Sequence, residues 1–240
     1  MTNLKRIALV TGANKGIGLE IARQLGQAGV QVIIGARDVE RARVAVDALR
    51  AEGLHADTLR LDLDDHATIA AAATVIENAH GKLDILVNNA GIFDFNDAPP
   101  SRASLDAVRR VMEVNFIGAL AVSQAMLPLL RSAPAGRIVN LASSLGSLTL
   151  NADPASPYYS QQYIGYNASK AALNMLTIQL SEELRGTGIV VNSVSPGFVK
   201  TDLTGYGSMT PQEGARLPVQ YALAGNATGL FVEPNGQTSW

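Results

Sequence analysis

Short apolar runs rich in β-branched residues alternate along the chain with longer stretches in which apolar residues recur every three or four positions. The short runs predict seven strands, at 6–10, 30–34, 56–61, 85–87, 136–141, 189–194 and 229–232. The longer stretches predict helices at 17–28, 39–52, 67–80, 105–131 and 166–185. The strands are almost continuously apolar, as a parallel sheet covered by helices on both faces requires. We therefore predict an α/β fold with a doubly wound, seven-stranded parallel sheet.

No internal repeat, heptad pattern, charge run or linker divides the sequence, so we expect residues 1–240 to form a single domain. Three irregular stretches, 93–104, 146–165 and 203–220, each follow a predicted strand. Open parallel sheets bind ligands beyond the carboxyl ends of their strands. We expect these three stretches to form the walls of a substrate cleft, and their aromatic residues suggest that the cleft is mostly apolar.

Composition excludes several classes of protein. The chain is 47% hydrophobic and 17% charged, which excludes a disordered or fibrous protein. Its 19 basic and 21 acidic side chains leave a net charge of −2, too balanced for a nucleic-acid partner. It has no cysteine. The first apolar run, 7–10, is too short for a secretory signal, and no stretch approaches the ~20 apolar residues of a membrane span, so we expect a cytoplasmic protein.

A glycine-rich loop, TGANKGIG at 11–18, joins the first predicted strand to the first predicted helix. In such a loop Gly12 allows a tight turn, Gly16 a close backbone approach to a pyrophosphate, and Gly18 close packing of helix on strand. The same residues also fit an ordinary glycine-rich turn between a strand and a helix. The loop therefore needs support from the rest of the sequence.

A second motif, YNASK, places Tyr166 and Lys170 four positions apart, on one face of a predicted helix. Alone, this spacing fits a buried tyrosine beside a solvated lysine equally well. Three further polar features follow predicted strands or interrupt apolar helices: NNAG at 88–91, Asn115 and Ser143. Together they indicate a catalytic site, since chance does not easily place all of them at one edge of a sheet.

In this order, TGxxxGxG, NNAG, the helical asparagine, the strand-end serine, YxxxK and a Pro-Gly pair resemble the classical short-chain dehydrogenase/reductase family over essentially the whole chain. The stretches 14–18, 36–38, 61–65 and 228–240 resemble its carbonyl-reductase-like branch. The resemblance implies a Rossmann fold and an NADP(H)-dependent oxidoreductase. Such an enzyme reduces a ketone or aldehyde, a small-molecule carbonyl substrate, to an alcohol by hydride transfer.

The resemblance also implies four catalytic roles. Tyr166 is the general acid/base, Ser143 hydrogen-bonds the substrate carbonyl, and Lys170 holds the nicotinamide ribose. Asn115 orders a water in a proton relay toward Lys170, although a buried amide that braces backbone groups is compatible with that position too. A phenol with an ordinary pKa near 10 is a poor acid/base at neutral pH, and a nearby ammonium and the oxidised nicotinamide can lower that pKa.

Two adjacent serines compete for the carbonyl contact. The family pattern IVNxxS places the catalytic serine three residues after Asn140 and three before Gly146, and both offsets select Ser143. Ser144 is then expected to be a structural hydroxyl that bonds nearby backbone.

Cofactor choice depends on the residue after the second strand, where a carboxylate binds the ribose of NAD and a cation pairs with the 2′-phosphate of NADP. Ala36 occupies the family's acid position and Arg37 follows it. Lys15 adds a second cation, and Asp38 is easily mistaken for the NAD carboxylate. A guanidinium pairs strongly with a phosphate. We therefore favour NADP(H) as the cofactor, with Arg37 at its 2′-phosphate, over an interpretation in which Arg37 is only a solvated surface charge.

The resemblance places Asp62 and Leu63 at the adenine, the NNAG segment under the adenosine, and PGFVKT at the nicotinamide and phosphates. We expect no metal site. The cofactor-binding residues it implies are Gly12, Asn14, Lys15, Gly16, Ile17, Gly18, Arg37, Asp62, Leu63, Asn89, Ala90, Gly91, Tyr166, Lys170, Pro196, Gly197, Val199 and Thr201.

Other functions remain open. They are an NAD(H)-linked secondary-alcohol dehydrogenase, a 3-oxoacyl-carrier-protein-type reductase and a noncatalytic NADP-sensing regulator, which the intact YxxxK motif disfavours. A sugar-nucleotide epimerase has the same Tyr-Lys pair but a larger C-terminal domain than the residues after Gly197 allow. The resemblance also implies a mode of assembly, since most family members form dimers or tetramers by pairing the helices that begin near Leu105 and Tyr166 with a twofold mate. We predict that the long segment 147–165 shields these helices and leaves a monomer rather than a dimer or tetramer.

Overall fold

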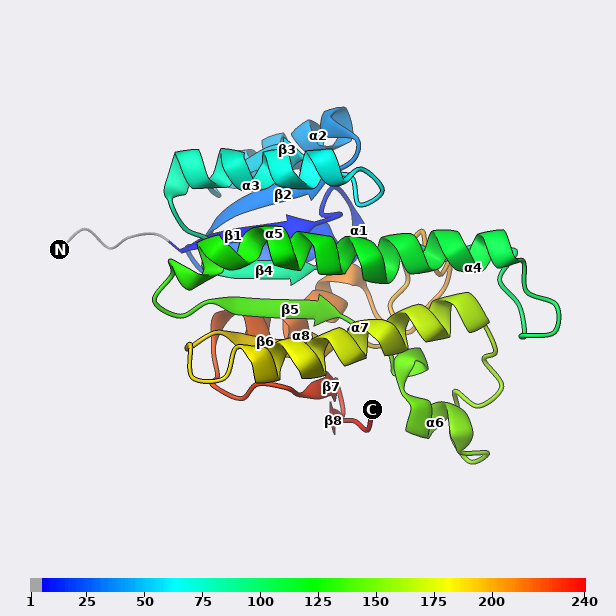
Figure 1. Cartoon of the computed structure of the whole chain (residues 1–240). Coiled ribbons are helices and arrows are strands. Elements are labelled where there is room, and N and C mark those ends of the chain that lie inside the picture. Colours follow the sequence, from blue (N-terminus) through cyan, green and yellow to red (C-terminus); the bar gives the residue numbers. More distant parts are fainter. Residues whose placement is uncertain (1–5) are drawn as a thin grey trace.

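One eight-stranded sheet runs through the computed structural model, which describes residues 6–240 (Figure 1). Its strands are β1 (Ile7–Thr11), β2 (Gln31–Ala36), β3 (Ala56–Arg60), β4 (Ile85–Asn88), β5 (Arg137–Leu141), β6 (Val190–Val194), β7 (Phe231–Glu233) and β8 (Gly236–Gln237), in the order β3-β2-β1-β4-β5-β6-β7-β8. The first seven are parallel and correspond to the seven predicted strands. The predicted count was one short, because β8 is a two-residue antiparallel return that leaves no apolar run.

Helices cover both faces of the sheet, as predicted (Figure 1). They are α1 (Gly16–Gln27), α2 (Val39–Ala51), α3 (His66–His80), α4 (Leu105–Met112), α5 (Ala119–Arg131), α6 (Leu148–Ala152), α7 (Ile164–Glu183) and α8 (Pro211–Leu223). Side chains alternate across β1: Ala8 and Val10 join a core with α1, α2 and α8, while Ile7 and Leu9 join a second core with α3, α5 and α7. This alternation is why the whole strand is apolar.

The predicted helix at 105–131 is one helical span with an irregular centre. A π-helical turn, Glu113–Gly118, separates α4 from α5 and carries the buried Asn115. Gly118 belongs to the same turn, and a Cβ there would lie 2.6 Å from the Cβ of Leu63. The close approach of this turn to the segment after β3 therefore requires glycine.

Helix α8 was missed, because the stretch 203–220 was expected to be irregular and α8 begins inside it at Pro211. The sequence did carry a signal. Thr210 accepts a hydrogen bond from the backbone N–H of Glu213 at 3.2 Å, and the Glu213 carboxylate accepts one from the Thr210 N–H at 2.8 Å. This is a capping box with proline at the first helical position, followed by an internal Pro218 that weakens the helical pattern. Helix α6, inside the stretch 146–165, and a short 3₁₀ turn just before it, Ser144–Gly146, were also missed.

The expectation that no stretch resembles a membrane span was also wrong. By length and composition, the helical span Leu105–Arg131 is apolar enough to cross a membrane. Packing explains its composition, since α5 buries Val122 and Met126 against the sheet and α3 in the second core. A core helix of a globular domain meets the same criterion, so the span is weak evidence for a membrane.

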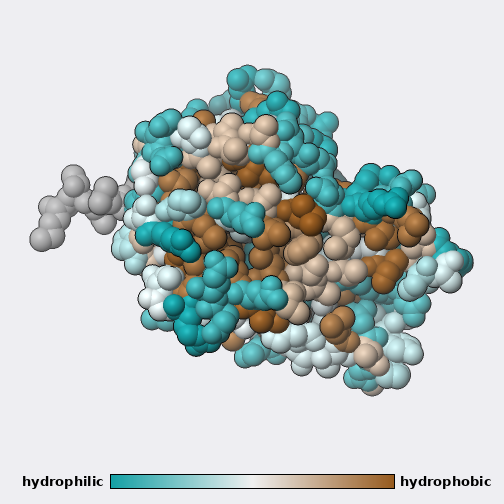
Figure 2. Space-filling view, in the orientation of Figure 1, coloured by the Kyte–Doolittle hydropathy of each residue, from teal (hydrophilic) through white to brown (hydrophobic). Residues whose placement is uncertain are grey.

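The segment 147–165 does not shield the face formed by α5 and α7. Helix α6 lies beside the start of α7, away from the groove between the two long helices (Figure 1). Leu120, Leu127 and Gln179 line this groove, and apolar residues are exposed along this side of the molecule (Figure 2). The reason given for a monomer is therefore wrong, and the oligomeric state itself stays a prediction.

We expect Thr210→Ala to lower the free energy of unfolding by about 1 kcal/mol, because it removes the hydroxyl that caps α8. In a chain of this length, the melting temperature should fall by about 2–4 °C. Thr210→Ser keeps the hydroxyl and should melt close to the wild type. Equal losses in the two variants would show that the cap does not hold this helix.

Candidate active site

The carboxyl ends of the parallel strands bring the predicted motifs to one edge of the sheet. The strand order reverses between β1 and β4, which are neighbours although β2 and β3 lie between them in sequence. Such a switch point opens a crevice for a ligand. Thr11, at the end of β1, accepts hydrogen bonds at 3.0 Å from the backbone N–H groups of Asn89 and Ala90, after β4. The glycine-rich loop and the NNAG segment therefore form one surface.

The glycines of the loop have the local geometry that the motif requires. Gly12 has φ +64°, and a Cβ there would lie 2.9 Å from the Cα of Ala90. At Gly18 a Cβ would lie 2.4 Å from the Asn89 amide nitrogen, so this glycine allows close packing of α1 on the strands. Gly16 has φ +59° and open space on the side a Cβ would occupy, with Thr201 as the nearest neighbour at 4.0 Å.

The start of α1 fits a phosphate group. Within residues 6–240, the N-cap residue Lys15 makes no side-chain cap, so it leaves the first backbone N–H groups of α1 available to a ligand. Exposed N–H groups and the helix dipole favour an anion at this point. The residues present therefore fit the pyrophosphate of a dinucleotide.

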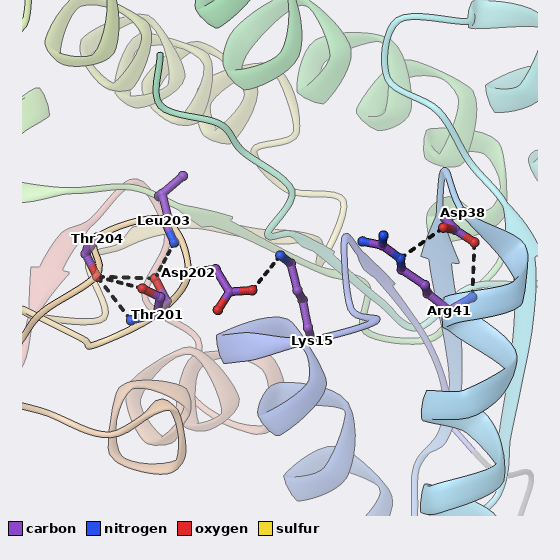
Figure 3. Close-up of polar contacts among 7 residues, drawn as sticks. All are labelled: Lys15, Asp38, Arg41, Thr201, Asp202, Leu203 and Thr204. Atoms are coloured by element: carbon purple, nitrogen blue, oxygen red, sulfur yellow. Dashed lines mark hydrogen bonds and ion pairs between the residues drawn. The ribbon is translucent and has the colours of Figure 1, made fainter. Parts of the chain in front are cut away.

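The end of β2 lacks a free carboxylate. Ala36 is buried and Arg37 is exposed, and Arg37 makes no salt bridge within residues 6–240. Asp38 instead begins α2: its carboxylate accepts a hydrogen bond from the Arg41 N–H at 3.1 Å and pairs with the Arg41 guanidinium at 3.1 Å (Figure 3). Arg41 is a cation beside this position that the sequence analysis missed, although it lies four residues after Arg37 on the following helix.

Lys15 pairs with a carboxylate of the segment that follows β6. Its ammonium lies 2.7 Å from the carboxylate of Asp202, on the loop after β6 (Figure 3). The hydrogen bond from Lys15 lowers the pKa of Asp202. Both side chains are well exposed, so water screens their attraction. A bound phosphate and Asp202 would therefore compete for the same ammonium.

Three other predicted cofactor residues, Asp62, Leu63 and Thr201, lie in segments that follow β3 and β6. Thr201 belongs to a loop that closes on itself, where the Thr204 hydroxyl donates to the carbonyl of Val199 at 2.9 Å. Asp62 follows β3, and Leu63 is buried against the π-helical turn. Within residues 6–240, no three His, Asp or Glu side chains gather as metal ligands would.

Tyr166 and Lys170 lie in the first turns of α7 and meet β5 and its following turn. The Lys170 ammonium is buried and donates to the Leu141 carbonyl at 2.8 Å. It lies 5.7 Å from the centre of the Tyr166 ring, and the ring of Phe93 packs edge-on against that ring with centres 5.8 Å apart. Burial lowers the pKa of Lys170 to about 8.

The acidity of Tyr166 differs from the sequence expectation. Burial raises the pKa of its phenol to about 12, and the neighbouring Ser143 hydroxyl only partly opposes this rise. Lys170 was expected to lower this pKa, but its ammonium is turned toward the Leu141 carbonyl. Desolvation therefore prevails over attraction, and the protein's own residues keep the phenol protonated at neutral pH. A protonated phenol suits proton donation.

The two adjacent serines have different surroundings. Ser144 is buried and donates to the Glu233 carboxylate at 2.5 Å, with the Ser195 hydroxyl 3.4 Å away. Ser143 is less buried, accepts a 3.2 Å hydrogen bond from the Leu145 N–H and lies beside Tyr166. The hydroxyl of Ser144 is thus already engaged, whereas that of Ser143 faces the tyrosine. Glu233, which holds Ser144, gave no local sequence signal because it lies 89 residues away.

Asn115 braces the backbone, which was one of its two expected roles. Its amide pairs with both backbone groups of Ile92, accepting at 2.8 Å and donating at 3.0 Å, and it also donates to the Ser169 hydroxyl at 3.0 Å. It therefore ties the segment after β4 to α7. A Cβ at Gly91 would lie 3.3 Å from the Asn115 oxygen and 3.5 Å from the Lys170 nitrogen. The water relay stays a prediction.

The lowered pKa of Lys170 predicts a pH-dependent stability. Between pH 8 and 10.5 the unfolded chain binds more protons at this lysine than the folded chain, so stability rises with pH. Lys170→Met removes this dependence. In urea unfolding, the variant's stability relative to the wild type should therefore fall by about 3 kcal/mol from pH 7 to pH 10.5. For exposed Lys200→Met, the difference from the wild type should stay constant; a constant difference for Lys170→Met would contradict the expectation.

Comparison with known proteins gives a consistent family assignment. The family model described as short chain dehydrogenase matches residues 6–211. A short-chain dehydrogenase, anuI, of Penicillium roqueforti is 36% identical and covers 95% of this chain and 92% of its own. Carbonyl reductase [NADPH] 1 of Homo sapiens is 34% identical over 98% of both chains. The crystal structure of NADPH-bound carbonyl reductase from chicken fatty liver superposes with a TM-score of 0.86 at 31% identity, covering 98% of this chain and 99% of that one. The chain therefore belongs to the short-chain dehydrogenase family.

Proposed function

We propose that the protein is an NADP(H)-dependent oxidoreductase that reduces a ketone or aldehyde to an alcohol, with Tyr166 as its general acid. One observation carries the proposal: Tyr166, Ser143 and the buried Lys170 converge at the end of β5, beside the crevice that fits a dinucleotide. Relatives whose names include carbonyl reductase [NADPH] support the substrate class and the cofactor.

NADPH would supply the hydride that adds to the carbonyl carbon. The chain's residues handle the oxygen and its proton. The hydroxyls of Ser143 and Tyr166 hydrogen-bond the carbonyl oxygen, and the Tyr166 phenol transfers its proton to that oxygen as negative charge develops. Because the pKa of this phenol is raised to about 12, the phenol stays protonated at neutral pH and can donate its proton. Lys170, whose ammonium lies 5.7 Å from the centre of the Tyr166 ring, would hold the nicotinamide ribose, and the phenolate regains a proton from solvent before the next turnover.

The charges at the other end of the crevice support NADP(H) over NAD(H). Arg37 is free to pair with a 2′-phosphate, and Asp38 is occupied by Arg41. Lys15 could also bind the phosphate if its ammonium left Asp202. The exchange is favourable because a phosphate carries more charge than a carboxylate.

Tyr166→Phe removes the proton donor but keeps the ring against Phe93. We expect the turnover of NADPH with a panel of ketones and aldehydes to fall by at least about 10²- to 10⁴-fold, while NADPH binding, followed by fluorescence, changes little. Tyr221→Phe, on α8, is the matched control and should keep full activity. Near-native turnover by Tyr166→Phe would refute the mechanism, and a wild type that binds NADPH but reduces no carbonyl would favour a cofactor-sensing regulator.

Arg37→Ala should lower the preference for NADPH over NADH, measured as the ratio of the two kcat/KM values. Because a charge-assisted phosphate contact is lost, we expect this ratio to fall roughly ten- to hundredfold. Arg43→Ala removes an equal charge from α2, at a position paired with Glu40, and should leave the ratio unchanged. If Arg37→Ala also leaves it unchanged, another group selects the cofactor.

A further inference from the structure

Helix α7, which carries Tyr166, is capped by a residue far from it in sequence. Its own N-cap residue, Tyr163, has no side chain able to bond the first N–H groups. The carboxylate of Asp97 takes that place: one oxygen accepts the Gly165 N–H at 3.0 Å and the other accepts the Tyr166 N–H at 2.8 Å. The Ala98 carbonyl accepts the N–H of Ile164 at 3.3 Å, so two consecutive residues of the loop cover the first turn of α7.

The Asp97 carboxylate is buried and is held by backbone donors. Its side chain pairs with no Lys, Arg or His within residues 6–240, and it also accepts the Ala98 N–H at 2.9 Å. A buried charge without a counter-ion persists only where donors and dipoles stabilise it, and the start of a twenty-residue helix provides both. Space is tight as well, since a Cβ at Gly165 would lie 3.1 Å from the carboxylate and 3.2 Å from the Cα of Val108.

The same loop also supports the Tyr166 ring. Phe93 packs against Tyr166 and against Tyr163, with ring centres 5.8 and 5.1 Å apart. Asp94 of the same loop pairs instead with Arg110 of α4. The backbone and the ring of Tyr166 are thus both held by the segment that leaves β4, the strand whose end forms part of the crevice.

From these contacts we propose that Asp97 is a positioning residue, which fixes Tyr166 at the distance from the substrate carbonyl that proton transfer requires. It touches neither the reacting atoms nor the crevice, and it acts through the backbone N–H of Tyr166. The proposal rests on the proposed role of Tyr166. A displacement of a reacting group by about 1 Å can slow a reaction about a hundredfold, so removal of this cap should reach the chemical step.

Asp97→Ala and Asp97→Asn test this role, and Asp94→Asn is the matched control because it neutralises a carboxylate of the same loop that bonds α4 instead of α7. We expect the single-turnover rate of NADPH oxidation to fall about ten- to hundredfold in Asp97→Ala. Asp97→Asn retains one acceptor oxygen and should lie between Asp97→Ala and the wild type. The Kd for NADPH should change by less than about twofold, and the melting temperature should fall by about 2–4 °C. Asp94→Asn should keep the wild-type rate.

Several results would overturn the positioning role. One is a wild-type rate per NADPH-binding site in Asp97→Ala despite a lower melting temperature, which would make the cap purely structural. Another is an equal loss of rate in Asp94→Asn and Asp97→Asn, or a loss of NADPH binding in Asp97→Asn. If Asp97→Ala does not fold, Asp97→Asn decides on the same criteria. Tyr166→Phe separates the two proposals: an active Tyr166→Phe enzyme refutes the proposed function, whereas a wild-type rate in Asp97→Asn, with Tyr166→Phe inactive, refutes positioning alone.

Discussion

Burial of the parallel sheet on both faces is the constraint on which the rest of this structure depends. Since neither face meets water, polar side chains that must contact a ligand can stand only beyond the strand ends. Some of the polar groups inside are bonded to one another. Asn88 donates to Asn140 at 2.8 Å, Asn140 donates to Thr177 at 2.8 Å, and the hydroxyls of Thr177 and Ser193 lie 2.7 Å apart. This chain of bonds crosses β4, β5 and β6 and reaches α7.

Helix α7 is therefore located by polar contacts along its length, in addition to its apolar packing. Asp97 bonds its first turn, Lys170 bonds the Leu141 carbonyl at the end of β5, and Thr177 joins the buried amides. Hydrogen bonds are directional, so they determine the rotation and the axial position of a helix more closely than apolar contacts do. The proposed acid and the proposed ribose contact lie between these fastened points.

The two ends of the crevice use charge in opposite ways. At the reacting end, Tyr166 and Lys170 are held in surroundings that disfavour their charged forms, so each pKa moves away from its ordinary value, to about 12 and about 8. Elsewhere around the crevice, the side chains of Arg37 and Lys15 are exposed to water. Buried groups suit the transfer of a proton, whereas exposed cations suit the capture of a phosphate that arrives from solution.

The sequence by itself determined the seven parallel strands, the long helices other than α8, the glycine-rich loop and the Tyr166/Lys170 spacing. These depend on short periodic patterns and on residues that are close in the chain. Only the tertiary structure decided how Lys15 meets Asp202, how Glu233 engages Ser144, how Asp97 caps α7 and which way the pKa of Tyr166 moves. Each of these contacts joins segments far apart in sequence, and desolvation depends on everything packed around a group. A local sequence pattern therefore predicts neither these long-range contacts nor the degree of desolvation.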